Sequence, residues 1–241
     1  MFGEIVTLKK TEHSKLRLKP STSVEHIRNQ HLIPLVVHEF PFIALNFPII
    51  FAKNPSTNQF NAAVLLGFEE YENILVSDNS WAAVYIPESS RCYPFKIQGE
   101  SYTDSNAVIG FYQDSPNLSY TEGDLLFDDE GEATEVLQKI TQFLTQHAEK
   151  NVITQKFVQY LTDNDLFKES NIVINKEDGS RHKVAGIYCV DEDKIKNLPN
   201  EKFIELKEKG YLPPIYTHLF SMGQINRLLE IKHRNKHAAS S

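Results

Sequence analysis

The chain has 241 residues, of which 41% are hydrophobic and 24% charged, and its formal net charge is −7. This is the composition of a globular protein large enough to bury its own core. The acidic balance excludes a general nucleic-acid binder, because such a protein needs a basic field to displace counterions from phosphates.

The N-terminal half alternates short apolar runs with turn residues, which is typical of β-strands. The predicted strands cover residues 4–9, 47–51, 62–68, 74–77, 81–86, 95–98, 107–112 and 125–127. A short buried helix is predicted within residues 34–46, where Pro41 is tolerable only in the first turn. Hairpin-length links at 69–73 and 78–80 predict that strands 62–86 form an antiparallel meander, which the later strands extend.

From Thr134 onward the apolar spacing becomes that of amphipathic helices. Helices are predicted at residues 134–148, 152–161, 191–194, 200–209 and 218–233. Strands at 171–175 and 184–190, with Asp178-Gly179 as a turn between them, predict a hairpin. Pro213–Tyr216 is expected to be rigid and extended. The fold class predicted is α+β: an antiparallel sheet of short meander and hairpin strands, with helices concentrated in the C-terminal half. We expect one domain over residues 1–241, with 237–241 frayed.

Sequence motifs for metal catalysis are incomplete. His38-Glu39 begins the HExxH pattern, but Phe42 stands in place of its second histidine. His147 and Glu149 are two residues apart on a predicted helix, so they point in different directions and do not form an iron site. We therefore predict no metal and no cofactor.

Other reactive groups have simpler structural interpretations. Cys92 and Cys189 lack CxxC spacing and are expected to be free thiols, although a single bridge between them stays open. The acidic cluster at 124–132 lacks the glycine of a calcium loop and favours a solvated turn. His218 with Ser221 suggests a nucleophile pair, but no GxSxG elbow surrounds the serine.

The segment from Trp81 to Phe95 is the strongest candidate for a binding site. Trp81, Tyr85, Arg91 and Tyr93 could present a cation and aromatic rings to a ligand, peptide or glycan. The alternative, which we favour, is a corner or sheet edge whose aromatic side chains are core. In that case Arg91 would be buried in a charge pair or bonded to backbone.

A series of segments, in order and over nearly the whole chain, carries a family resemblance. These segments are residues 13–18, 34–40, 47–51, 64–67, 73–76, 81–87, 91–95, 126–134, 178–179, 186–191, 218–221 and 226–228, with Lys194, Leu198 and Gly210. Together they resemble the SapC family of S-layer-associated bacterial proteins. The sequence departs from the family pattern at Cys92, where a second arginine is usual beside Arg91, and at Ala133, where proline is usual. The missing arginine weakens any proposal that this corner grips an anion.

The resemblance implies a non-enzymatic accessory or binding protein that handles a surface-layer, peptide or protein client. It brings no catalytic residue with it. The alternative is an enzyme modifying amino acids or peptides, in which His38, Glu39 and His218 would have to converge with Arg91 and Tyr93. The N-terminus lacks the apolar stretch of a secretory signal, and no segment is long and apolar enough to span a membrane. We expect a cytoplasmic protein without nucleic-acid partners, unless a signal-less route exports it.

Overall fold

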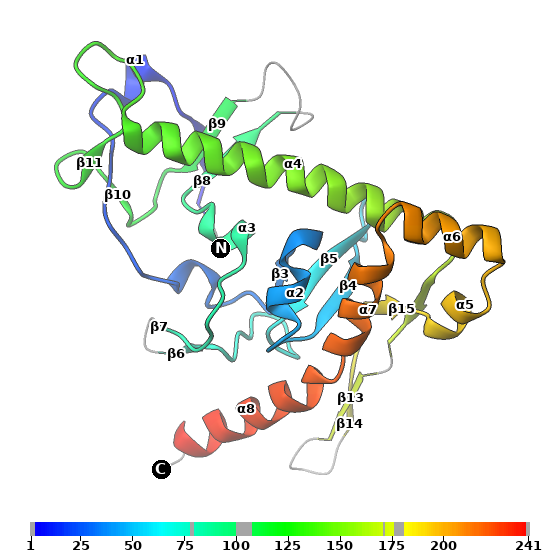
Figure 1. The fold of residues 1–241 in the computed structure, drawn as a ribbon. Coiled ribbons are helices and arrows are strands. Elements are labelled where there is room, and N and C mark those ends of the chain that lie inside the picture. Colours follow the sequence, from blue (N-terminus) through cyan, green and yellow to red (C-terminus); the bar gives the residue numbers. More distant parts are fainter. Residues whose placement is uncertain (1–2, 78–79, 100–107, 171, 176–180, 240–241) are drawn as a thin grey trace.

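The computed structural model describes residues 3–77, 80–99, 108–170, 172–175 and 181–239. It has an α+β fold with antiparallel sheets of short strands and helices concentrated in the C-terminal half (Figure 1), which confirms the predicted class. The largest sheet has the strand order β12-β15-β4-β5-β3. Its strands are β12 Phe167–Glu169, β15 Ile187–Val190, β4 Ile49–Lys53, β5 Phe60–Leu65 and β3 Leu32–Pro34.

The centre of this sheet is the antiparallel pair β4 and β5, in which Ile49 lies opposite Val64. Ile49, Ile50 and Phe51 are each 0% exposed. Because neighbouring residues of a strand point to opposite faces, this run shows that both faces of β4 are covered. The helix α4, Glu135–Asp163, packs on β5, and α7, Leu212–Ser221, packs on β4 and β15.

A second group of strands lies at the other end of the molecule (Figure 1). It comprises the sheet β1 Ile5–Thr7, β9 Val108–Tyr112 and β8 Phe95–Gln98, and the small sheet β10 Leu118–Ser119, β2 Arg17–Leu18 and β11 Asp124–Leu125. A separate cluster of buried side chains belongs to this group. Its members are Leu16, Phe95, Phe111, Leu126, Phe127, Leu137 and Leu144.

The long helix α4, Glu135–Asp163, is the element shared by both hydrophobic clusters. Its N-terminal half places Leu137 and Leu144 in the second cluster, and its C-terminal half places Phe157 and Leu161 in the first. Thr134 caps it by accepting a hydrogen bond from the backbone N–H of Leu137.

The prediction of two helices at 134–148 and 152–161 was wrong, because α4 continues through Glu149–Asn151. Those residues interrupt the apolar pattern without a proline or glycine to stop the helix. Lys150 has a tertiary role here, since it forms an ion pair with Glu88 on the short helix α3, Glu88–Arg91.

The predicted meander over residues 62–86 is not formed. The neighbours of β5 are β4 and β3, whereas β6 Val76–Ser77 and β7 Ser80–Trp81 form their own hairpin. Beyond Trp81 the chain leaves strand geometry, and the indole Nε1 of Trp81 donates to the carbonyl of Tyr85. Strand β9 pairs with β1 on one side and β8 on the other, and this sheet does not extend the main one. Pairing with distant strands prevailed over the local hairpins that turn composition indicated.

The short helical segments of the N-terminal half connect these sheets. They are α1 Lys10–His13, η1 Glu25–Ile27, η2 Val37–Glu39, α2 Phe40–Ile43 and α3 Glu88–Arg91. As predicted, Pro41 lies in the first turn of α2, where its missing N–H leaves no bond unmade. The predicted corner between Pro87 and Pro94 contains α3, followed by a cis peptide bond before Pro94.

The C-terminal part contains β13 Ile172–Asn175, β14 Arg181–Val184, α5 Glu192–Lys196, α6 Asn200–Glu208, α7 Leu212–Ser221 and α8 Gln224–Ala239. A hairpin forms between β13 and β14, but its second strand is Arg181–Val184 and not the expected 184–190. Residues 187–190 instead form β15, which pairs with β12 and β4. The Asp178-Gly179 turn lies outside the described residues. Gly210, with φ of +70°, ends α6 as expected.

The prediction that Pro213–Tyr216 is extended was wrong. Pro213 and Pro214 stand in the first turn of α7, where proline fits a helix because the first N–H groups have no intrahelical acceptor. The single helix expected at 218–233 is divided instead at Met222 and Gly223 between α7 and α8. None of the helices described is long and apolar enough to cross a membrane.

Candidate functional site

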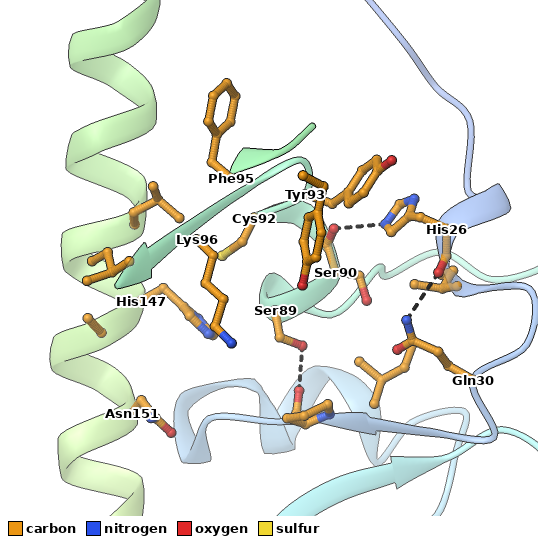
Figure 2. A pocket seen from close by; sticks show the side chains of 17 residues that line it. His26, Gln30, Ser89, Ser90, Cys92, Tyr93, Phe95, Lys96, His147 and Asn151 are labelled. Carbon is orange, nitrogen blue, oxygen red and sulfur yellow. Dashed lines mark hydrogen bonds between the residues drawn. The ribbon is translucent and has the colours of Figure 1, made fainter. Parts of the chain in front are cut away.

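A cavity of about 380 Å³ lies beside α4, between α3, β8, η1 and β3 (Figure 2). Much of its wall is apolar, formed by side chains such as Ile33, Phe95 and Leu144. The polar and charged lining residues are His26, Gln30, Ser89, Ser90, Lys96, His147 and Asn151. An apolar hollow with a few convergent polar groups is the usual form of a binding site.

The buried carboxylate of Glu39 holds α3 at the wall of this cavity. Glu39 is 1% exposed, and its Oε1 accepts hydrogen bonds from the backbone N–H of Glu88 at 2.7 Å and from the Tyr85 hydroxyl at 3.1 Å. Its Oε2 accepts from the N–H of Val36 at 3.0 Å. Burial raises the pKa of Glu39, and the backbone donors of Glu88 and Val36 partly offset this effect. The position of Ser89 and Ser90 therefore depends on Glu39.

Three aromatic rings form one side of the cavity. The rings of His26 and Tyr93 are stacked with centroids 4.3 Å apart, and Tyr93 is stacked with Tyr112 at 5.6 Å. His26 Nε2 lies 3.0 Å from the carbonyl oxygen of Ser90. Burial lowers the pKa of His26, which keeps the imidazole neutral at pH 7. With Nε2 donating to Ser90, Nδ1 remains as an acceptor.

His147, on α4, lines the cavity with a carboxylate behind it. Its Nδ1 lies 3.4 Å from Oε2 of Glu88, and Oε1 of Glu88 is 2.7 Å from Nζ of Lys150. Burial acts to raise the pKa of Glu88, but the hydrogen bond and charge of Lys150 outweigh it and the pKa is lowered. Burial lowers the pKa of His147, with Glu88 opposing. The arrangement is an ionised glutamate facing a neutral imidazole, whose Nε2 is left for a ligand.

The hydroxyl of Ser90 is a buried, unpaired polar group at this wall. Ser90 is 6% exposed, and its Oγ has no hydrogen-bond partner among the described residues. Its neighbour Ser89, by contrast, donates to the carbonyl oxygen of Pro34 at 2.7 Å. Buried hydroxyl groups are nearly always paired, so Ser90 is an exception, but its oxygen is enclosed and does not open onto the cavity.

The thiol of Cys92, also in this wall, is unsuited to nucleophilic catalysis. Burial raises its pKa to about 12, with the negative charges of Glu88 and Glu39 adding to the effect. The thiolate is the reactive form, so Cys92 stays a weak neutral donor at pH 7. Cys92 and Cys189 are both free thiols.

A smaller cleft of about 260 Å³ adjoins the first and shares Cys92, Tyr93, Phe95 and Leu144 with it. Here the guanidinium carbon of Arg91 lies 5.0 Å from the centroid of the Phe143 ring. Arg91 is exposed, and none of the described residues forms a hydrogen bond or ion pair with it. The expectation that Arg91 is buried in a charge pair or bonded to backbone was therefore wrong.

Comparison with protein families matches residues 8–228 to SapC. The chain belongs to the SapC family. No curated protein and no solved structure matches it.

The candidate residues of this SapC chain are spread over several environments. Tyr93 lines both clefts, and Arg91 lines the smaller one. Trp81 and Tyr85 pack against the first hydrophobic cluster, and the exposed His38 lies on η2. Glu39 has been described above as the anchor of α3.

His218 lies in the core and is 0% exposed. Its Nδ1 is 2.8 Å from the carbonyl oxygen of Ile49, and its Nε2 accepts from the N–H of Val190 at 3.0 Å. Ser221 donates to the carbonyl of His218 and accepts from the N–H of Ile49. These side chains attach α7 to β4 and β15, and they do not form a nucleophile pair.

Residues 128–132 of the acidic cluster form a solvated turn, as predicted, whereas Asp124 lies in β11. Asp128 Oδ1 accepts from the N–H groups of Glu130 and Glu132, and Gly131 has φ of +79°. Within the described ranges, no three histidine, cysteine or acidic side chains are grouped as metal ligands.

Sequence reasoning missed the part that Glu88, Ser90 and His147 play together. The available signal was the spacing of Lys139, Phe143, His147 and Asn151, which recur every four residues and therefore share one face of α4. That the partners of this face come from α3 and η1 could not be read from the spacing.

Proposed function

We propose that this SapC chain is a non-enzymatic accessory protein that binds a peptide or protein client, and that the 380 Å³ cavity receives a segment of that client. The carrying observation is the cavity itself, an apolar hollow lined by the rings of His26 and His147 (Figure 2). Burial lowers the pKa of both imidazoles, so they offer neutral acceptors to the N–H groups of a client.

The SapC resemblance supports a client connected with a surface layer, handled in the cytoplasm. It supports accessory work rather than catalysis, since the resemblance supplies no catalytic residue. In this proposal the four candidate residues have different roles; they are Trp81, Tyr85, Arg91 and Tyr93. Tyr93 and Arg91 contact the client, and Trp81 and Tyr85 support the wall on which they stand.

Crosslinked co-purification from the native host tests the proposal. Asn151, half-buried in the cavity wall, is changed to Phe to fill the space, and the exposed Gln142 is changed to Phe as the matched control. The two positions are nine residues apart and so lie on opposite faces of α4. We expect a specific protein or peptide with wild type and Gln142→Phe, and its loss with Asn151→Phe. Recovery of the same proteins with all three chains would overturn the assignment of the cavity.

A second candidate is an enzyme that modifies amino acids or peptides, favoured by the Glu88–His147 pair. A carboxylate that orients a neutral imidazole is the arrangement of a general base. The version with His38, Glu39 and His218 as catalytic groups is not supported, because Glu39 and His218 are buried away from any ligand. Mass spectrometry of a peptide mixture before and after incubation would reveal turnover. Product formed by wild type and lost in His147→Gln would favour the enzyme; unchanged peptides favour the binding protein.

A further inference from the structure

The two clefts are aligned along one face of α4. The smaller cleft contacts Lys139 and Phe143, and the larger one contacts His147 and Asn151. Leu144 belongs to both walls. Twelve residues of α-helix separate Lys139 from Asn151, a distance of roughly 18 Å. An extended peptide advances about 3.3 Å per residue, so roughly five residues would span this face.

The charge of this face differs from that of the whole protein. The charged side chains that line the two clefts are Arg91, Lys96 and Lys139, all cationic, although the chain has a net charge of −7. No aspartate or glutamate is among the described residues of either lining. Glu88, which lies behind His147, is already compensated by Lys150.

Arg91 is better placed than Lys139 to bind an anion. Lys139 is engaged with Glu135 at 2.6 Å, whereas Arg91 has only the Phe143 ring as a described partner. The ring supports one face of the guanidinium and leaves its N–H groups at the edge for an acceptor. A carboxylate matches this fork with two parallel hydrogen bonds.

We propose that the client is held as an extended peptide segment of roughly five residues along α4, with a carboxylate on Arg91 and its other end in the larger cavity. This inference rests on the proposed function and names its ligand class. Apolar side chains of the segment would lie between the two ends, against Phe143 and Leu144. The carboxylate is an acidic side chain or the C-terminus of the peptide.

Affinity selection from random pentapeptides tests this, using one pool with free C-terminal carboxylates and one with carboxamides. We expect enrichment of carboxylate-bearing peptides. If acidic sequences are also retained from the carboxamide pool, the carboxylate on Arg91 is that of an acidic side chain. If only the free-acid pool yields binders, it is the C-terminal carboxylate. Titration calorimetry of a selected peptide should show about tenfold weaker binding with Arg91→Gln, the effect of losing one charge-assisted contact. The exposed Arg234→Gln, which removes the same charge elsewhere, should bind within about twofold of wild type.

The inference requires a peptide long enough to reach both clefts, whereas the proposed function requires only the larger cavity. Dipeptides cut from a selected peptide should bind at least about tenfold more weakly, because they contact one cleft only. If Asn151→Phe abolishes binding while Arg91→Gln does not change it, the peptide orientation is wrong and the cavity assignment stands. If no pentapeptide is enriched, the inference falls, and co-purification of the client still decides the proposed function. If neither variant changes peptide binding, α4 is not the binding face.

Discussion

The hydroxyl of Tyr85 donates a hydrogen bond to Oε1 of Glu39 at 3.1 Å, although the two residues are 46 positions apart. The same oxygen accepts from the N–H of Glu88, which begins α3. One buried carboxylate therefore connects η2, the segment after Trp81 and the wall of the candidate site.

Removing this carboxylate should be costly. Glu39→Ala leaves the N–H groups of Val36 and Glu88 without their acceptor, and we expect a loss of about 3 kcal/mol in the free energy of unfolding. Tyr85→Phe removes one hydrogen bond and should cost about 1 kcal/mol. Urea unfolding measures both. The exposed Glu149→Ala should change the free energy little; an equally small effect of Glu39→Ala would show that the carboxylate does not anchor α3.

His218 should make stability depend on pH. Burial lowers its pKa from 6.5 to about 4, so the unfolded chain binds a proton that the folded chain does not between these values. Stability is therefore complete above pH 6.5 and falls as pH drops toward 4, by about 2 kcal/mol from pH 7 to pH 5 for this group. The measurement is urea unfolding of wild type and His218→Gln at both pH values. The stability difference between them should shrink at pH 5; a difference independent of pH contradicts the prediction.

The Cys92 thiol should react slowly although it lines two clefts. A pKa of about 12 lowers the thiolate fraction near pH 8, and we expect native Cys92 to react about a thousandfold more slowly than a free thiol. The rate is measured from the colour that a disulfide reagent releases. The Cys189→Ser variant is used so that Cys92 is the thiol observed. Reaction as fast as glutathione would indicate a thiolate and reopen nucleophilic catalysis.

The prediction of one domain can be tested through the single tryptophan, Trp81, which packs against the first hydrophobic cluster. Leu137 lies in the second cluster, and Leu137→Ala should cost about 3 kcal/mol. If α4 joins both clusters into one cooperative unit, this substitution shifts the unfolding transition seen by Trp81 fluorescence as far as that seen by circular dichroism. If the fluorescence transition does not shift, the chain contains two units that unfold independently.

Local signals in the sequence were reliable where they report local chemistry. Thr134 caps α4, Gly210 ends α6, and Pro41 stands in the first turn of α2, each as its residue type requires. The same reasoning failed at Pro213–Tyr216, because proline is equally suited to a helix start and to an extended segment.

The candidate site was only partly predictable. The aromatic cluster and Arg91 drew attention to residues 81–95, but the exposure of Arg91 and the burial of His218 depend on elements far away in the sequence. Glu88 and His147 are 59 residues apart, and no periodicity joins them.

By itself the sequence determined the α+β class, the SapC family and the lack of a complete metal or nucleophile motif, because these follow from residue types and their spacing. Tertiary structure alone decided that β5 pairs with β4 and β3, that α4 is continuous, and that Ser90, His26 and His147 share one cavity. The physical reason is that the period of a strand or helix defines which face is apolar but not which distant element will cover it.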